Sequence, residues 1–264
     1  MPEWIEAVIL GIVQGLTEFL PVSSSGHLEI TKYILDDNSI AEQSMLTTVF
    51  LHFATALATI YVFRSDIIKL ISGIFDKTDN NARSFTFYII ISMIPAVIVG
   101  LAFESQIESL FNRNMLLVGI CLIVTAILLY VSERLSSGGK TLNTSRSLLV
   151  GIAQAVAILP GISRSGATIS SSLLLGLDKE QAARFSFLMV VPLIFGKIFK
   201  DILSGAFVSD MPDLSYLLAG FVAAFLSGVW ACKFMIRLVK ASGLYWFAFY
   251  CFTIALIAIF VGLN

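Results

Sequence analysis

Two short polar segments stand inside otherwise apolar sequence, and they contain residue types that could bind and cleave a phosphate group. The first is residues 11–26, GIVQGLTEFLPVSSSG, and the second is residues 151–166, GIAQAVAILPGISRSG. At an offset of 140 positions (151 minus 11) they share six identities in sixteen, including a Ser-x-Ser-Gly register. A duplicated pair of Gly/Pro-interrupted apolar segments indicates a binding site between the two halves of a membrane protein.

The first segment places a carboxylate and several hydroxyls at membrane depth. Gln14 and Glu18 are four residues apart, so they share one face of a helix. A carboxylate inside a bilayer costs about 2.5 kcal/mol or more, so Glu18 indicates a functional site; a structural Glu held by a nearby hydroxyl or amide is the alternative. His27 is a better candidate for chemistry than His52, which we expect to pack or to support the site from behind. The serines between Pro21 and His27 are Ser23, Ser24 and Ser25.

The second segment differs from the first at the residues that matter chemically. An isoleucine and an alanine replace Glu18 and His27, and Arg164 stands opposite Ser24. Arginine suits phosphate because its planar fork offers fixed donors and keeps its charge. The apolar helix that follows would direct its positive N-terminus to the same place. The alternative is a structural Arg164 neutralised by Glu18. The neighbours that offer hydroxyls or backbone N–H groups are Gly161, Ser163, Ser165, Gly166 and Thr168.

Together the two segments would supply an acid/base pair and a nucleophile from one half of the chain and an anion clamp from the other. That division suits phosphoryl transfer, in which positioning and charge stabilisation provide most of the rate. Because the residues lie within apolar sequence, the phosphate would belong to a lipid.

The composition is that of an integral membrane protein. The 264 residues are 57% hydrophobic and 13% charged, whereas soluble domains carry about 25% charged residues. The formal net charge of −1 provides no basic footprint for nucleic acid. The N-terminus lacks the positive region of a cleaved signal peptide, so we expect its first apolar stretch to remain in the mature protein. Cys121, Cys232 and Cys251 lie in apolar runs, and we expect them to be small core residues.

The apolar pattern predicts an all-α fold with six membrane-spanning helices and two broken hairpins. A spanning helix needs roughly 20 apolar residues. The stretches that meet this test are 46–63, 85–103, 115–131, 185–203, 215–235 and 244–262. Two further apolar regions, 4–35 and 147–177, are interrupted by Pro, Ser and Gly. Irregular backbone at membrane depth must be buried in protein or line a wet cavity, so we predict re-entrant helix–loop–helix hairpins.

We interpret residues 1–264 as one membrane domain made of two inverted repeats. Each half, 1–135 and 145–264, contains one re-entrant hairpin and three spans, and three crossings invert the second half. The loops 64–84, 132–147 and 233–243 are rich in Lys and Arg and should face the cytoplasm. The alternate loops, 104–114 and 200–214, are acidic and hold only Arg113 and Lys200 as basic residues. Both termini should therefore face outward, and the hairpin tips should meet inside the membrane.

The two motifs are similar to those of a known family. The run from Gln14 to His27 resembles the (E/Q)xxxE motif and serine loop of bacterial undecaprenyl-diphosphatases, the bacitracin-resistance family. The run from Pro160 to Thr168, PGISRSGAT, resembles that family's PGxSRSxxT motif. The segment 94–97, Ile-Pro-Ala-Val, and the C-terminal pattern are similar too, so the resemblance covers nearly the whole chain.

The resemblance implies hydrolysis of undecaprenyl diphosphate to undecaprenyl phosphate on the outer side of the bacterial cytoplasmic membrane. This reaction recycles the lipid carrier for peptidoglycan and depends on a divalent cation. It implies that Glu18, Ser24, His27 and Arg164 are catalytic. The residues implied to bind substrate are Gln14, Ser23, Ser25, Gly161, Ser163, Ser165, Gly166 and Thr168. The family position of Gln14 is often Glu, so a metal site with two carboxylates is not expected here.

Several alternatives follow from the same residues. Ser24 attacks the terminal phosphorus with His27 as its base, or His27 is the nucleophile and Ser24 a phosphate ligand. Mg²⁺ or Ca²⁺ would be held by Glu18 together with the diphosphate oxygens. A different class of function is a carrier that flips undecaprenyl phosphate and uses Arg164 to bind its head group. A structural membrane subunit would leave Glu18 and Arg164 unexplained. The expected partners are the diphosphate lipid and membrane lipid, without nucleic acid, and a homodimer is left open.

Overall fold

A computed structural model describes residues 2–35, 41–76, 79–111, 114–203, 213–241 and 243–263. Within these residues the regular structure is entirely helical, which confirms the predicted fold class. The first half of the chain forms α1 (Glu3–Phe19), α2 (Ser24–Leu35), α3 (Ala41–Val62), α4 (Arg64–Phe75), α5 (Asn80–Ala102), α6 (Glu104–Ser109) and α7 (Met115–Leu135). The second half forms α8 (Thr144–Val156), α9 (Arg164–Leu174), α10 (Lys179–Leu203), α11 (Leu214–Ala241) and α12 (Tyr245–Leu263).

The six predicted spans all fall in long apolar helices. Five of these, α5, α7, α10, α11 and α12, are long and apolar enough to cross a membrane by themselves, and a sixth crossing is counted if α3 and α4 are taken as one bent span. The chain is therefore a multi-pass membrane protein. The division into repeats at 135 and 145 stays a prediction, with α7 ending at Leu135 and α8 beginning at Thr144.

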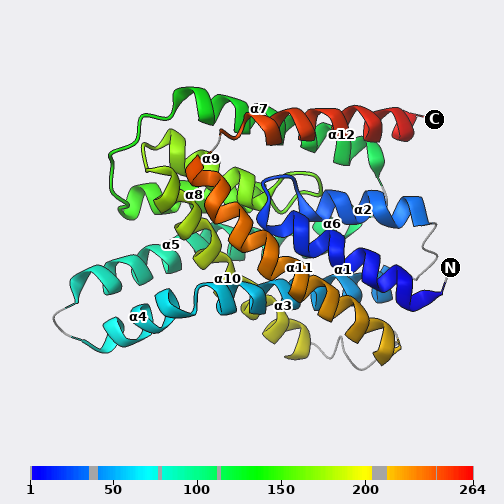
Figure 1. Cartoon of the computed structure of the whole chain (residues 1–264), viewed down its shortest axis with the longest axis horizontal. Helices are drawn as coiled ribbons and strands as arrows, with labels where there is room; N and C mark the ends of the chain where they lie inside the picture. Colours follow the sequence, from blue (N-terminus) through cyan, green and yellow to red (C-terminus); the bar gives the residue numbers. More distant parts are fainter. Residues whose placement is uncertain are drawn as a thin grey trace.

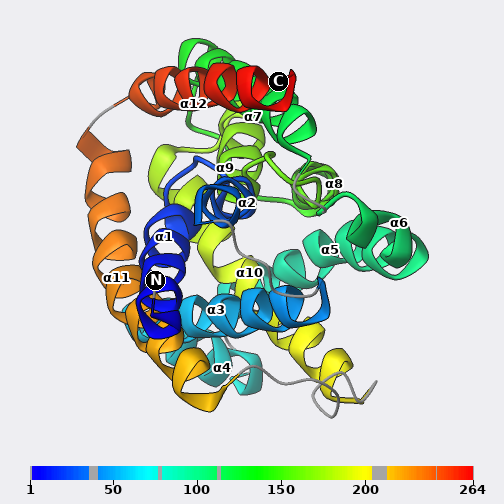
Figure 2. The same cartoon turned by 90° about the vertical axis from the view of Figure 1, so that its right-hand side faces the viewer.

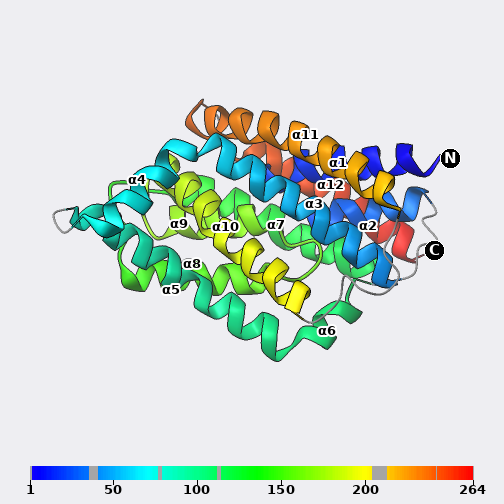
Figure 3. The same cartoon turned by 90° about the horizontal axis from the view of Figure 1, so that it is seen from below.

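The segment 64–84 is not a simple loop as the sequence analysis expected. It contains α4, which is bent by 77° from α3. The helix carries Ile68, Ile71 and Phe75 on its exposed surface, between polar residues. It is too short and too amphipathic to span a bilayer, so the hydropathy test alone did not find it. Figure 3 shows α4 at the end of the molecule opposite the two termini. Lys77 and Arg113, which we used to orient the chain, lie outside the described residues.

The two broken hairpins enter the molecule from opposite ends. Figure 1 shows α1 running inward from the end that carries both termini and α2 returning to it, while α8 and α9 come from the other end. The breaks cover residues 20–23 and 157–163, where Pro21 and Pro160 lie. Viewed from the end with the termini, α2 and α9 lie near the centre, with α11 and α12 outside them (Figure 2).

The helix packing is compatible with an inverted repeat. The hairpin helix α1 packs on α11 of the other half, and its counterpart α8 packs on α5, while the last helices of the two halves, α7 and α12, pack on each other. Two glycines of the repeated segments make this possible. A Cβ at Gly11 would lie 2.3 Å from the Gly220 carbonyl oxygen, and a Cβ at Gly151 would lie 2.4 Å from the Ser92 carbonyl oxygen. The shared glycines therefore permit the same close helix approach in both halves.

Candidate active site

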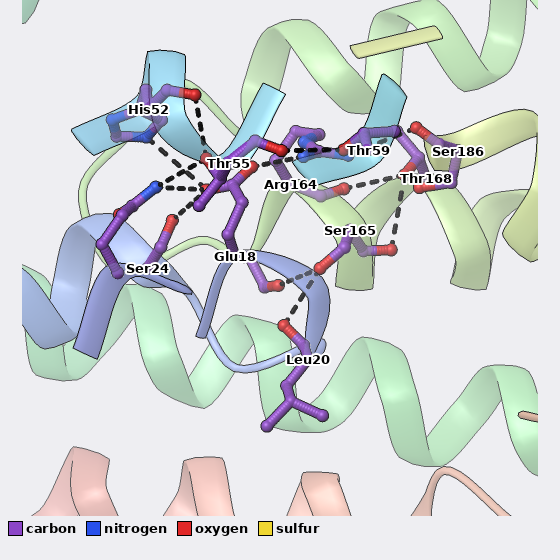
Figure 4. Close-up of polar contacts among 12 residues, drawn as sticks. Glu18, Leu20, Ser24, His52, Thr55, Thr59, Arg164, Ser165, Thr168 and Ser186 are labelled. Atoms are coloured by element: carbon purple, nitrogen blue, oxygen red, sulfur yellow. Dashed lines mark hydrogen bonds and ion pairs between the residues drawn. The ribbon is translucent and has the colours of Figure 1, made fainter. Parts of the chain in front are cut away.

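The tips of the two hairpins touch inside the molecule. A Cβ at Gly26 would lie 3.0 Å from the Cα of Gly161, so the two loops meet backbone to backbone. The Ser165 hydroxyl donates to the Leu20 carbonyl oxygen at 3.1 Å, a contact that joins α9 to the first loop (Figure 4). The predicted meeting of the tips is thus observed.

The shared Ser-x-Ser-Gly register forms the same helix N-cap in both halves. The Ser23 hydroxyl accepts a hydrogen bond from the Gly26 N–H at 3.2 Å, and the Ser163 hydroxyl accepts one from the Gly166 N–H at 3.0 Å. A side-chain oxygen that bonds the amide three residues on is the usual cap of a helix. In each loop the two serine hydroxyls lie 3.3 Å apart, Ser23 with Ser25 and Ser163 with Ser165. These serines shape the loops, and their predicted role in binding substrate stays a prediction.

Glu18 is the centre of the polar cluster between the tips. Its side chain is buried, and its Oε2 accepts hydrogen bonds from Ser24 Oγ at 2.7 Å and from Gln14 Nε2 at 3.1 Å. Its Oε1 forms an ion pair with Arg164 Nη2. Figure 4 shows the carboxylate between helices of the two halves. The serine hydroxyl and the guanidinium that the sequence analysis selected therefore both contact the carboxylate, each through a different oxygen.

The side chain of Arg164 is bonded to the neighbouring backbone and remains partly exposed. It is the first residue of α9, its Nη1 donates to the Ser186 carbonyl oxygen at 3.2 Å, and its side chain is 15% exposed. Thr168, one turn later, has its hydroxyl 2.6 Å from the Ser186 hydroxyl and donates to the Arg164 carbonyl oxygen at 2.9 Å. Arg164 thus begins a helix, and the positive N-terminus of a helix is a favourable place for an anion.

His27 does not lie against Glu18, contrary to the expectation from the sequence. Its Nδ1 bonds the Ser23 carbonyl oxygen at 2.8 Å, and its Nε2 lies 2.9 Å from the Tyr250 hydroxyl. The physical reason is that both ring nitrogens are already bonded, one within the first hairpin and one by a side chain of α12. The ring turns back along the helix to the carbonyl four residues before it and outward to α12.

His52, which we expected to pack or support the site, is the histidine beside the cluster. Its Nε2 lies 3.6 Å from Glu18 Oε2, its Nδ1 bonds the Thr48 carbonyl oxygen at 2.8 Å, and 27% of its side chain is exposed. The sequence held a signal for it. Thr48, His52, Thr55 and Thr59 recur at helical spacing within the largely apolar second part of α3 and form a polar stripe on one helix face. Figure 4 shows three of these residues along the cluster.

The residues present could bind a divalent cation only if most of its ligands came from another molecule, such as a diphosphate. Within the described residues there is no group of three or more His, Cys, Asp or Glu side chains that could hold a metal ion. Glu18 is already bonded by Arg164, Ser24 and Gln14, while the buried Gln14 Oε1 has no hydrogen-bond partner. One carboxylate and one amide oxygen fit a cation that arrives on diphosphate oxygens and fall short of a complete protein cage.

The fold and the cluster define a helical membrane protein with a shared polar centre built from two opposed broken hairpins. Residues 7–257 match the model of the family described as bacitracin resistance protein BacA. The chain is 58% identical over 254 residues to the undecaprenyl-diphosphatase of Christiangramia forsetii, covering 96% of each chain. It is 42% identical over 265 residues to that of Bacteroides fragilis, and 40% identical over 275 residues to that of Methanobrevibacter smithii, with at least 97% of each chain covered. The chain belongs to the bacitracin resistance protein BacA family.

Proposed function

We propose that this chain hydrolyses undecaprenyl diphosphate to undecaprenyl phosphate and orthophosphate. The names of its full-length relatives support this activity. The single structural observation that carries it is the contact of Ser24, Glu18 and Arg164 at the junction of the two tips. A nucleophile, a base and an anion clamp are thereby placed together in a lipid-facing protein. The reaction returns the lipid carrier to peptidoglycan synthesis and confers resistance to bacitracin, in accord with the family description.

In this proposal the ion pair between Arg164 and Glu18 opens when substrate binds, and Arg164 pairs with the diphosphate of the substrate instead. The guanidinium fork binds two phosphate oxygens, and the N-terminus of α9 adds its positive dipole. Ser24 Oγ then forms a bond to the terminal phosphorus while the bond from that phosphorus to the bridging oxygen breaks. Glu18, 2.7 Å from Ser24 Oγ, accepts the hydroxyl proton. Undecaprenyl phosphate leaves, and water then cleaves the phosphoserine to orthophosphate and restores Ser24.

The alternative nucleophile is His27. The geometry favours Ser24, because its hydroxyl bonds Glu18, the carboxylate that is paired with Arg164. Both ring nitrogens of His27, by contrast, are bonded to Ser23 and Tyr250. Trapping and mapping the phosphorylated residue decides between them. A phosphohistidine at residue 27 would contradict the Ser24 assignment.

We also propose that Glu18 would hold a divalent cation, Mg²⁺ or Ca²⁺, together with the diphosphate oxygens of the substrate. When bound, it would neutralise charge on the diphosphate oxygens. Removal of divalent cations with a chelator should therefore stop phosphate release without unfolding the protein, because no protein cage depends on the ion.

We place the protein in the bacterial cytoplasmic membrane with both termini and the active site accessible from outside. The two termini lie at one end of the molecule, and the connection after α7 lies at the other (Figure 1). That connection carries Arg134, Lys140 and Arg146. Because basic loops remain in the cytoplasm, this end should face inward. The partners in this proposal are the diphosphate lipid and the surrounding membrane lipid, and a homodimer stays an open expectation.

Phosphate release from the purified full-length protein tests the function. In detergent with undecaprenyl diphosphate and Mg²⁺, the wild type should release orthophosphate, and Arg164→Ala should lose at least 10²–10³ in rate, about the effect of removing one preorganised donor. A lipid carrier would need only the anion site. Binding of undecaprenyl phosphate without any phosphate release by the wild type would therefore reject hydrolysis and favour the carrier.

A further inference from the structure

Helix α12 holds the tip of the first hairpin next to Ser24. The Tyr250 hydroxyl of α12 lies 2.9 Å from His27 Nε2, and the two rings are nearly parallel, with centroids 5.5 Å apart and an interplanar angle of 9°. At the next residue, Cys251 Sγ lies 3.7 Å from the Pro21 carbonyl oxygen. α12 therefore contacts the first loop on both sides of Ser23 and Ser24.

The chemistry of these groups fixes the direction of each hydrogen bond. The Ser23 carbonyl oxygen can only accept, so the Nδ1 of His27 carries the proton of that 2.8 Å bond. In a neutral imidazole the Nε2 is then an acceptor, and the Tyr250 hydroxyl donates to it. His27 thus connects α12 to the Ser23 backbone, and both of its nitrogens are used for this connection.

Ser23 has a backbone conformation that needs such support. Its φ of +72° is the single positive φ of a non-glycine residue within the described parts of the chain. L-residues other than Asn and Asp rarely adopt this region, because the Cβ crowds the following carbonyl oxygen. Ser24 follows directly, and its hydroxyl bonds Glu18 at 2.7 Å. A backbone rotation at Ser23 would therefore carry the Ser24 hydroxyl away from the carboxylate.

The second loop is held in a corresponding way by the first half of the chain. Thr125 of α7 donates from its hydroxyl to the Gly161 carbonyl oxygen at 3.1 Å and accepts from the Ser163 N–H at 3.0 Å. The left-handed residue there is Gly161, with φ +98°, which adopts that conformation without strain. Since α7 and α12 are the last helices of the two halves, each half fixes the loop of the other. The first loop instead has a serine, Ser23, in the left-handed conformation, and it is held by the connection from Tyr250 through His27.

We propose that Tyr250 and His27 are positioning residues for the hydrolysis. Tyr250 orients His27, His27 holds the Ser23 carbonyl, and the Ser23 turn presents the Ser24 hydroxyl to Glu18. This inference rests on the proposed function, and it gives His27 a role other than proton transfer to the substrate.

Tyr250→Phe removes the hydroxyl while keeping the ring contact. It should lower kcat about tenfold, equivalent to about 1.4 kcal/mol, and leave KM unchanged because Arg164 is untouched. Tyr245→Phe is a matched control on the same helix; its ring contacts Tyr130, and it should retain wild-type activity. Adding Ser23→Gly to Tyr250→Phe should restore several-fold of the lost kcat, since glycine takes the left-handed conformation by itself. A wild-type kcat in Tyr250→Phe would overturn the proposal. So would a loss of kcat that Ser23→Gly does not restore and that is accompanied by a lower Tm.

Two substitutions of His27 separate positioning from proton transfer. Asparagine can place its amide nitrogen where Nδ1 donates to the Ser23 carbonyl, whereas alanine cannot. His27→Asn should therefore be at least fivefold more active than His27→Ala and should keep both limbs of the wild-type pH–rate profile. If His27→Asn is as inactive as His27→Ala, or loses one limb, His27 takes part in the proton transfer and the proposal is wrong.

A measurement independent of activity tests the contact itself. The chain has two histidines, so ¹⁵N-histidine NMR of the full-length protein in nanodiscs, with His52→Gln for assignment, resolves His27. It should show the Nδ1–H form, and Tyr250→Phe should move the Nε2 resonance. An unmoved resonance would overturn the contact even in an active enzyme. A wild type that shows the shift but releases no phosphate would instead contradict the proposed function.

Discussion

At the scale of single residues, the decisive feature is that Glu18 and Arg164 neutralise each other before any substrate binds. Burying either charge alone would be expensive, and their ion pair joins helices from opposite halves. The structural alternative raised by the sequence, an arginine neutralised by Glu18, is thus geometrically correct. It does not exclude function, because a diphosphate can replace the carboxylate at the guanidinium. The pair stabilises the fold and also keeps the anion clamp charged and in place.

Replacing Glu18 with glutamine separates binding from catalysis. Glu18→Gln removes the anion that is paired with Arg164 and also the proposed proton acceptor of Ser24. We therefore expect hydrolysis to fall by about 10² or more, in the range of general-base catalysis, while affinity for undecaprenyl phosphate rises. Phosphate release and a lipid-binding titration on the same preparation measure the two effects. Weaker lipid binding together with retained hydrolysis would contradict the assignment of Glu18 as base.

The second residue-scale prediction concerns His52. Its Nε2 lies 3.6 Å from Glu18, so the contact is one that an amide could also make. His52→Gln keeps a polar side chain near the carboxylate and should keep most of the activity, whereas His52→Leu leaves that side of the buried carboxylate without a polar neighbour and should lower the activity. Phosphate release by the two variants measures the difference. Equal activity of the two would show that the contact does not matter to the reaction.

Much of the cluster could be predicted from the sequence, and the exceptions have a geometric cause. Glu18, Ser24 and Arg164 are in contact as expected because the repeat itself indicated that the two tips meet. The histidines were assigned by proximity in sequence, which favoured His27 over His52. The direction of each side chain decides which histidine lies beside the carboxylate. His27 bonds the Ser23 carbonyl oxygen and Tyr250, whereas His52 of α3 lies beside Glu18. Such contacts depend on packing that no local pattern contains.

At the scale of elements, close packing of the first hairpin on α11 is what brings its tip to the membrane interior. A Cβ at Gly15 would lie 2.0 Å from Ser227 Oγ and 2.6 Å from the Ala224 carbonyl oxygen. The helices can approach this closely only where a side chain is absent, as in small-residue interfaces of membrane helices. The sequence indicated the importance of Gly11 through the repeat, but Gly15 has no counterpart in the second segment and was not singled out.

Alanine substitution of two helix glycines tests this packing. Gly15→Ala should destabilise the protein by about 1–3 kcal/mol, as overpacking does, and lower its Tm in detergent. Gly100→Ala, in α5, is the matched control: no atom lies within 4 Å of the added Cβ, and the change should leave Tm equal or slightly higher. A larger Tm loss in Gly100→Ala than in Gly15→Ala would be inconsistent with the packing of α1 on α11.

At the scale of the whole molecule, the two halves are interdependent. Each hairpin packs on a helix of the other half, each loop is fixed by the other half's last helix, and the Glu18–Arg164 pair closes the contact between them. Neither half contains a complete polar cluster. The parity of the spans predicted two inverted repeats, and this arrangement is compatible with that prediction. The sequence did not predict α4, because a short amphipathic helix has no long apolar run.

The orientation of the molecule is the remaining whole-molecule prediction. Its three native cysteines, Cys121, Cys232 and Cys251, are buried, so single surface cysteines can report on each end. Ser105 lies in α6 at the end of the termini, and Ser137 follows α7 at the opposite end; both are exposed. In intact cells a membrane-impermeant maleimide should label Ser105→Cys and should label Ser137→Cys only after lysis. The basic loops near residue 137 remain in the cytoplasm in this topology. The reverse pattern would turn the molecule over and place the opening of its first hairpin, with Ser24 and Glu18, on the cytoplasmic side.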